Sequence, residues 1–373
     1  MLPMPDIWFP YLGIEIEHLS KIAFTIGNLS VAWYGVLISC GVICGLLLAR
    51  VLAKKSGQDP DFYTDFLIYA LIIGLLGARF YYVIFQWDLY KDNPITVFDF
   101  RSGGLGIYGG VIAAVITAVV YCRIKKKELL ELLDTAMPGL ILGQAIGRWG
   151  NFFNQECFGS YTDNFFAMRL NVKTAAYTTP ELTKLAVTKG GVTYIQVHPT
   201  FLYESFGCLV VLAIMLLLFK KRKFKGQVAF TYMIGYGILR AFVESLRTDQ
   251  LLIWNTNVPV SVLVSAAMAL AGVILMIVFA CKARVAALAG TEEGAAKAPD
   301  LSEDDEETAF SDADEASDAD PDKEDPIEEA SDETAVEGTD DQPESDEDNS
   351  EDSGAANETA EEEQKPTEED LWS

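Results

Sequence analysis

The segment Gly147-Arg148-Trp149-Gly150-Asn151-Phe152-Phe153-Asn154-Gln155-Glu156-Cys157-Phe158-Gly159 follows a long apolar run in this chain of 373 residues. It places an arginine, two asparagines and a glutamate among glycines and aromatic residues. Polar groups at hydrocarbon depth are costly unless they have partners, and a membrane-spanning helix has no structural need of them. We therefore interpret the segment as a functional site that handles an anion at a membrane surface.

Apolar runs long enough to cross about 30 Å of hydrocarbon recur on both sides of this segment. They predict seven membrane-spanning helices, near residues 33–52, 64–86, 104–122, 129–147, 200–219, 227–247 and 258–281. Before the first span, the alternation of Ile22, Phe24 and Ile26 predicts a short strand or hairpin. The expected fold class is therefore an all-α integral membrane protein with seven transmembrane helices.

Basic residues concentrate after the odd-numbered spans. They include Arg50, Lys54 and Lys55, then Arg123 and Lys125 to Lys127, then Lys220 to Lys223 and Lys225, and finally Lys282 and Arg284. Because basic loops face the cytoplasm, the amino terminus is expected outside and the carboxyl terminus inside. The connection 150–199 then lies outside, where its composition predicts a small extracytoplasmic cap with turns and strands.

Charge divides the chain into two parts. Of 54 acidic and 28 basic residues, 36 acidic residues and three lysines lie in 291–373, leaving 18 acidic and 25 basic residues on an apolar body. A segment this acidic cannot bury enough apolar surface to fold, so disorder is expected. We divide the chain into a seven-span domain, 1–290, and an acidic cytoplasmic tail, 291–373. The tail is interpreted as a solubilising appendage, with docking of cytoplasmic partners as the alternative.

Charged residues inside the spans point to one place. Arg79, Arg148 and Arg240 lie near the outer ends of spans two, four and six, and Glu244 follows Arg240 by one helical turn. The outer ends of spans one, three and five carry Trp33-Tyr34-Gly35, Gly103 to Gly110, and His198-Pro199-Thr200-Phe201-Leu202-Tyr203-Glu204. Their convergence predicts a cationic pocket at headgroup depth, where arginines bind a lipid phosphate.

Each of these residues also has a structural interpretation. Arg79 could extend to the membrane interface, Arg240 and Glu244 could form a structural ion pair, and His198 could be a structural loop residue. Tyrosines anchor helices at interfaces and glycines allow close packing. Of six cysteines, only Cys157 lies in the polar segment, as a candidate reactive thiol.

Residues 147–159 resemble the signature of the prolipoprotein diacylglyceryl transferase family at every defined position. Four further motifs are similar to that family: Trp33-Tyr34-Gly35, Gly77-Ala78-Arg79, His198 to Glu204, and Tyr236-Gly237-Ile238-Leu239-Arg240-Ala241-Phe242-Val243-Glu244. The resemblance extends from about residue 20 to 282 and excludes the acidic tail.

The resemblance implies a multi-pass enzyme of lipoprotein biosynthesis in a bacterial inner membrane. Such an enzyme moves the sn-1,2-diacylglyceryl group of phosphatidylglycerol to the lipobox cysteine thiol of a prolipoprotein signal peptide. A thioether forms and glycerol phosphate leaves. The expected partners are phosphatidylglycerol, prolipoproteins and membrane lipids, and not nucleic acid.

The resemblance also implies roles for individual residues. In the family, the positions of Arg148 and Arg240 bind the lipid phosphate and are required for activity. We take as candidate catalytic residues Arg148, Arg240, Tyr108, Glu156 and Glu244, with the two glutamates expected to orient the arginines. Candidate substrate-binding residues are Arg148, Asn151, Tyr34, Tyr236, Gly159, Asn154, His198, Tyr203, Glu204, Arg79 and Arg247.

One position departs from the family pattern. Many members have a histidine, proposed as the base, where this chain has Tyr108 before two glycines. Tyrosine side chains ionise near pH 10 and are poor bases at neutral pH, so either Tyr108 positions substrate or another group takes the proton. A lipid transporter using the same pocket and a membrane anchor for the tail are the rival functions. No metal-ligand spacing or nucleotide-binding loop is found, so we expect no metal or other cofactor.

Overall fold

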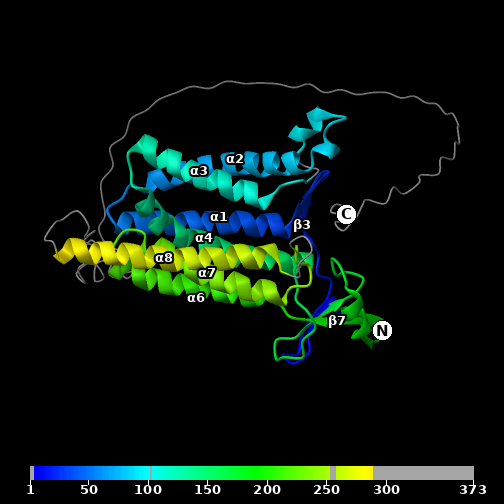
Figure 1. Cartoon of the computed structure of the whole chain (residues 1–373). Helices are drawn as coiled ribbons and strands as arrows, with labels where there is room; N and C mark the ends of the chain where they lie inside the picture. Colours follow the sequence, from blue (N-terminus) through cyan, green and yellow to red (C-terminus); the bar gives the residue numbers. More distant parts are fainter. Residues whose placement is uncertain (1–3, 101–102, 253–257, 289–373) are drawn as a thin grey trace, which may run out of the picture. The chain divides into compact units, whose positions relative to one another are not determined.

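The computed structural model describes residues 4–100, 103–252 and 258–288, and the predicted acidic tail lies outside these residues. Long helices run side by side in this part of the chain (Figure 1). They are α1 (Trp33–Lys55), α2 (Pro60–Phe85), α3 (Ile107–Lys125), α4 (Leu129–Asn154), α6 (Thr200–Lys221), α7 (Gln227–Leu246) and α8 (Val260–Leu288). The mainly helical prediction is confirmed.

Among the described residues, six helices are long and apolar enough to cross a membrane: α1, α2, α3, α4, α6 and α8. The remaining long helix, α7, packs between α6 and α8. It contains Arg240 and Glu244, and it is not among the helices that meet this criterion of length and composition. Length and composition therefore support six of the seven predicted spans, and the span at α7 stays a prediction.

Glycines allow α1 and α4 to approach closely. A Cβ atom added at Gly45 would lie 2.5 Å from the carbonyl oxygen of Gly139, and one added at Gly41 would lie 2.9 Å from that of Gly143. Small residues four apart on both helices form the close-packing pattern known from membrane helix pairs. This close contact fixes α4, which carries the functional segment, against α1.

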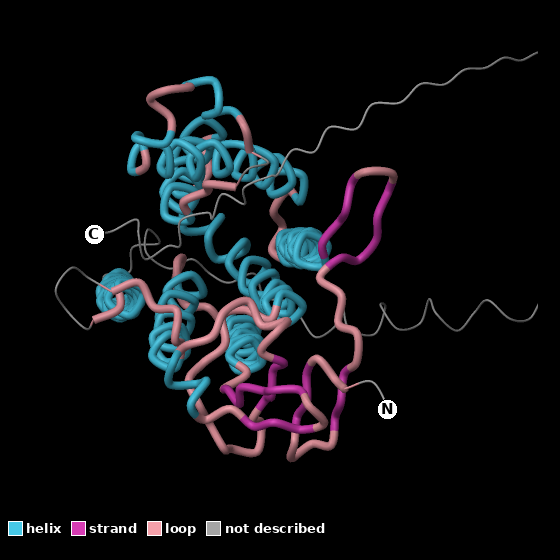
Figure 2. The backbone as a smooth tube through the Cα atoms, turned by 90° about the vertical axis from the view of Figure 1, so that its right-hand side faces the viewer, coloured by secondary structure: helices cyan, strands magenta, loops and turns pink. Residues whose placement is uncertain are grey.

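A five-stranded antiparallel sheet lies at one end of the helices, shown in Figure 2 as the larger group of strands. Its strand order is β2 (Ile14–Ile16), β1 (Ile7–Phe9), β5 (Met168–Asn171), β7 (Val192–Val197) and β6 (Val187–Lys189). The register pairs Ile7 with Leu170 and Leu170 with Ile195, and all three side chains are buried. The predicted cap with strands is confirmed, although two of its strands come from the amino terminus.

Two aromatic residues connect this cap to the helices. Phe152 of α4 and Phe201 of α6 belong to the same buried cluster as the cap residues Ile7, Leu170 and Ile195. A short helix, α5 (Pro180–Lys184), begins with a side-chain cap from Thr179 and adds Leu182 to that cluster. The cap therefore fixes the ends of α4 and α6, which carry the polar residues.

The predicted hairpin is also present. Strands β3 (Ile22–Ile26) and β4 (Leu29–Ala32) form a separate two-stranded sheet directly before α1. Two 3-10 helices, η1 (Trp87–Leu89) and η2 (Pro94–Phe98), lie in the connection between α2 and α3. This connection proves important for Arg79, as described below.

Candidate functional site

The functional segment begins as helix and ends as a tight turn. We expected the fourth span to end near residue 147, but α4 continues to Asn154 and includes Pro138 in its interior. Gln155 and Cys157 then adopt left-handed backbone conformations, with φ of 54° and 57°. The turn brings Glu156 back toward the helix, where its backbone amide donates to the carbonyl of Asn151 at 3.1 Å.

Glu156 contacts two asparagines and does not contact an arginine directly. Its Oε1 accepts hydrogen bonds from the side-chain amides of Asn151, at 2.9 Å, and Asn154, at 3.0 Å. The Oδ1 atom of Asn151 in turn accepts from Nη1 of Arg148 at 3.3 Å. The expected influence of Glu156 on an arginine is therefore transmitted through Asn151.

Glu204 connects the two central arginines. Its Oε1 lies 2.9 Å from Nη2 of Arg148 on α4, and its Oε2 lies 3.1 Å from Nη1 of Arg240 on α7. The hydroxyl of Tyr236 donates to the same carboxylate at 3.3 Å. A single carboxylate on α6 thus holds together arginines from two other helices.

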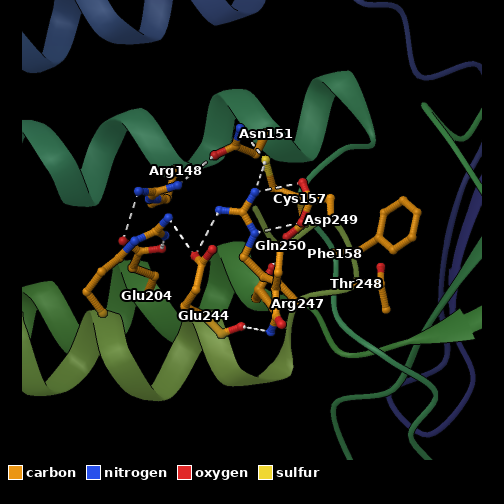
Figure 3. A network of polar contacts seen from close by, with 12 residues as sticks. Arg148, Asn151, Cys157, Phe158, Glu204, Glu244, Arg247, Thr248, Asp249 and Gln250 are labelled. Atoms are coloured by element: carbon orange, nitrogen blue, oxygen red, sulfur yellow. Dashed lines mark hydrogen bonds and ion pairs between the residues drawn. The ribbon is translucent and has the colours of Figure 1, made fainter. Parts of the chain in front are cut away.

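Glu244 and Asp249 extend this network (Figure 3). Oε2 of Glu244 lies 2.7 Å from Nη2 of Arg240, as the spacing of one helical turn predicted, and 3.4 Å from Nη1 of Arg247. Asp249 binds Arg247 through two parallel hydrogen bonds of 2.8 and 2.7 Å. Gln250 also donates to the backbone carbonyl of Glu244. Arg247 is consequently held in a fixed orientation beside the other arginines.

The carboxylates and arginines of this network differ in exposure. The side chains of Glu204 and Glu244 are only 2% and 3% exposed, whereas those of Arg148 and Arg240 are 21% and 17% exposed. The arginine side chains are therefore more accessible than the carboxylates that they contact. Such an arrangement suits an incoming phosphate, which arginine forks recognise through paired hydrogen bonds.

Backbone contacts at Gly159 position Arg247. Gly159 forms an antiparallel bridge with Arg247, and the amide of Ser160 donates to the carbonyl of Leu246 at 2.8 Å. A Cβ atom at Gly159 would lie 2.8 Å from both the Cβ of His198 and the carbonyl oxygen of Leu246. Glycine is required here because three chain segments meet at this point, so the contribution of Gly159 is steric.

The thiol of Cys157 lies inside the network. Its Sγ accepts from Nη2 of Arg247 at 3.3 Å and from the amide of Asn151 at 3.6 Å. Burial nevertheless raises the pKa of this thiol to about 11, because desolvation outweighs the nearby arginines. Burial alone would lower the pKa of Arg247, but the hydrogen bonds that it donates to Asp249 and the negative charges of Asp249 and Glu244 raise it. Arg247 therefore remains charged, and Cys157 remains a thiol at neutral pH.

Other candidate residues lie at the edge of this network. The ring of Tyr34 packs over Gly150, where an added Cβ would lie 2.6 Å from its Cδ2 atom. His198 and Tyr203 are neighbours, with 3.4 Å between Nδ1 and the hydroxyl, and both approach the side chain of Asn164. Burial lowers the pKa of His198, so its imidazole is neutral at pH 7.

Tyr108 and Arg79 lie in a different part of the bundle. Tyr108, on α3, packs near Tyr81 of α2, with 6.5 Å between ring centroids. Arg79 is 1% exposed, and its guanidinium donates to the backbone carbonyls of the α2–α3 connection. These carbonyls belong to Thr96, Val97, Asp99, Gly103 and Gly104, at 2.7 to 3.0 Å. The structure does not bring these two residues into contact with the arginine network.

The sequence interpretation omitted three residues that belong beside the site. Asp249 lies two residues after Arg247 and binds it. Gln144 lies one helical turn before Arg148 and exchanges hydrogen bonds with the hydroxyl of Tyr232, at 3.1 and 3.4 Å. Tyr232 stacks on Tyr236 with 5.5 Å between centroids. The spacing of four from Gln144 to Arg148, and from Tyr232 to Tyr236, was the available signal.

These features define a multi-pass membrane protein with a network of arginines and carboxylates at one end of its helices. The family model for prolipoprotein diacylglyceryl transferase matches residues 21–278, and the chain belongs to this family.

Curated relatives with the name phosphatidylglycerol--prolipoprotein diacylglyceryl transferase are similar over most of their length. One from Finegoldia magna is 46% identical over 260 residues, covering 69% of this chain and 95% of the relative. One from Bacillus cytotoxicus is 40% identical, covering 64% of this chain and 85% of the relative. One from Clostridioides difficile is 38% identical, covering 63% and 86%. The matched region contains the whole arginine network.

Proposed function

We propose that this protein transfers the sn-1,2-diacylglyceryl group of phosphatidylglycerol to the lipobox cysteine of a prolipoprotein signal peptide. The observation that carries the proposal is the set of part-exposed arginines above buried carboxylates, built on the family signature. The curated relatives that match this region are named for the same activity. The reaction is the first step in the maturation of bacterial lipoproteins.

The proposed reaction is a substitution at carbon. The acceptor thiolate attacks the glycerol carbon that bears the phosphate, a carbon–sulfur bond forms, and the carbon–oxygen bond to phosphate breaks. Glycerol phosphate leaves with the electron pair. Arg148 and Arg240 stabilise the charge that grows on this leaving group, and such electrostatic stabilisation is usually the largest contribution to catalysis.

Glu204 and Glu244 act as positioning residues in this proposal. They are buried and contact the arginines at 2.7 to 3.1 Å, so they hold the guanidinium planes before substrate arrives. Arg247 adds a third positive charge, which Asp249 orients. A thiol of the acceptor peptide placed beside these cations gains thiolate character. Asn151, Asn154 and Glu156 support Arg148 from the turn after α4.

Tyr108 is not the sole base in this proposal. It packs against Tyr81, and the described contacts of the arginines do not include it. The neutral imidazole of His198 is an alternative proton acceptor near the cap. In this proposal Tyr108 positions lipid, and Tyr34, Tyr236 and Tyr203 line the path to the arginines.

We also propose that the arginine network faces the outer side of a bacterial plasma membrane. The basic ends of α1, α3 and α6 support this orientation, since Lys54, Lys55, Arg123, Lys125, Lys220 and Lys221 lie in last turns. The first residues of α6 and the last residues of α4 and α7 carry the arginine network and therefore lie at the other end. With α7 as a seventh span, the carboxyl terminus is cytoplasmic, and 291–373 is an appendage to a transferase domain of residues 1–290.

One assay tests the activity. Purified protein is incubated with phosphatidylglycerol and a lipobox peptide, and mass spectrometry follows the diacylglyceryl mass increase on cysteine. A peptide with serine in place of cysteine and vesicles of phosphatidylethanolamine are the controls, and neither reaction should give product. A protein shortened after residue 290 should keep the activity of the full chain. Movement of intact phosphatidylglycerol without product would instead support a lipid transporter.

A further inference from the structure

A groove separates the carboxyl-terminal ends of α1 and α6. Both helices pack on α4, which lies between them in Figure 1. The groove has a volume of about 240 Å³. Its lining consists of Leu48, Val51, Leu52 and Lys55 from α1, and Leu216, Phe219 and Lys220 from α6. The two lysines belong to the last turns of their helices, so the groove is apolar along its length and basic at its end.

This groove is distinct from the arginine network. Glu204, which joins Arg148 and Arg240, lies in the first turns of α6, whereas Phe219 lies near its end. At the rise of an α-helix, the two positions are about 22 Å apart along the helix axis. A ligand in the groove therefore occupies the opposite end of the bundle from the proposed transfer site.

A buried arginine stands next to the groove. Arg222 directly follows α6, is only 7% exposed, and places its Cζ atom 4.7 Å from the centroid of the Phe219 ring. Its Nη1 atom has no hydrogen-bond partner among the described residues. The nearby Asp134 uses its two oxygens to accept from the backbone amides of Gly226 and Ala229, at 2.8 and 2.9 Å. Arg222 does not line the groove, so its buried guanidinium contributes positive charge behind Phe219 and no direct contact with a ligand.

We propose that this groove binds one anionic phospholipid, with an acyl chain along Leu48, Leu52 and Phe219 and the phosphate near Lys55 and Lys220. The apolar lining suits part of an acyl chain. An α-helix, which is about 10–12 Å wide with its side chains, is too wide for a groove of 240 Å³. In a bilayer the charged headgroup of a lipid lies just beyond the ends of its acyl chains. The lysines lie in the same position relative to the apolar part of the groove. The site makes and breaks no bond, and it does not depend on the transfer reaction.

Photo-crosslinking in nanodiscs of phosphatidylcholine tests this site on the full-length protein. Three probes carry a diazirine on one acyl chain and differ in headgroup: phosphatidylglycerol, phosphatidylserine and phosphatidylcholine. Both anionic probes should label peptides containing residues 48–55 and 216–222, about tenfold more than the phosphatidylcholine probe does. Labelling by phosphatidylglycerol alone would show a donor-specific site and would overturn recognition of anionic lipids as a class.

Paired substitutions separate the groove from the general charge of the membrane surface. The variant Lys55→Gln with Lys220→Gln should lose about tenfold of the anionic labelling. Its matched control, Lys54→Gln with Lys221→Gln, removes the same charge from the neighbouring residues, which do not line the groove, and should stay within about twofold. Equal loss in both variants, or equal labelling by all three probes, would show that only bulk lipid contacts the groove and would overturn the proposal. Leu216→Trp should block labelling by filling the groove while diacylglyceryl transfer continues, so the two proposals can fail separately.

Discussion

Two groups of buried arginine contacts lie at the same end of the helices and differ in what the guanidinium binds. Arg79 of α2 donates to five backbone carbonyls and is 1% exposed. Arg148 and Arg240 bind the carboxylates of Glu204 and Glu244 and keep part of their surface accessible. The first arginine organises a loop, whereas the other two are the ones that we propose to bind the phosphate of the lipid.

The difference shows that an arginine in a membrane-spanning helix is not by itself evidence of a binding site. Backbone carbonyls surround Arg79 and close the α2–α3 connection over it, so no face is left for a ligand. Tyr90 and Phe100 also pack against its guanidinium, at 5.1 and 5.8 Å from Cζ to the ring centroids. The partners of Arg148 and Arg240, in contrast, are carboxylates, and these two arginine side chains remain 21% and 17% exposed.

The largest expected effect follows from removing either exposed arginine. Arg148→Ala and Arg240→Ala should each reduce diacylglyceryl transfer about a thousandfold, because each removes charge stabilisation of the departing phosphate. Arg148→Lys should recover only a small part, since an ammonium cannot reproduce a planar fork. The measurement is product formation by purified protein, with size-exclusion profiles showing that each variant stays folded. Near-normal transfer by either alanine variant would contradict the assignment.

Removing Arg79 should have its main effect on stability. Arg79→Ala leaves backbone carbonyls of the α2–α3 connection without donors and should lower the free energy of unfolding by about 3 kcal/mol. Transfer per folded molecule should stay within about threefold of the parent protein. Thermal unfolding in detergent and active-fraction titration separate the two quantities.

Arg50→Ala is the matched control for Arg79. Arg50 forms an exposed ion pair with Asp61 at 2.7 Å, so its loss should cost about 1 kcal/mol or less. If Arg79→Ala kept full stability but lost transfer, Arg79 would belong to substrate binding, as the sequence first indicated, and the contrast between the two groups would be wrong.

A smaller effect is expected at the carboxylate that links the arginines. Glu204→Gln retains shape but removes the charge shared by Arg148 and Arg240, so the two guanidinium groups repel each other and lose alignment. We expect about a tenfold loss of kcat with a smaller change in KM for phosphatidylglycerol. Glu128→Gln, at an exposed pair with Lys225, is the control and should have no effect on transfer. An unchanged kcat in Glu204→Gln would show that the arginines are positioned without this carboxylate.

Sequence reasoning predicted most helices because apolar length is a local property, and it predicted the contact between Arg240 and Glu244 because one helical turn separates them. It did not predict the loop around Arg79, since backbone carbonyls from the α2–α3 connection leave no residue-specific signal. The pairing of β1 with β5 was also not predictable, because it joins segments about 160 residues apart. The role of Asp249 was also not predicted, since it depends on the turn after α7 that places its carboxylate on Arg247.

The smallest effect is expected at Cys157, which tests whether proximity to arginine suffices for reactivity. Burial raises the pKa of its thiol to about 11 despite the contact with Arg247. Alkylation by a maleimide should therefore be slow at pH 7.5 and should accelerate about tenfold per pH unit until the pH approaches this pKa. A variant in which Cys157 is the only cysteine allows mass spectrometry to follow it, and Cys157→Ser should transfer within about threefold of the parent protein. Rapid alkylation at pH 7.5 would mean that the arginines outweigh desolvation at this position. The cysteine of a bound acceptor peptide would then also become a thiolate through the charges of the arginines. Slow alkylation would instead indicate that a separate base removes the proton from the acceptor cysteine.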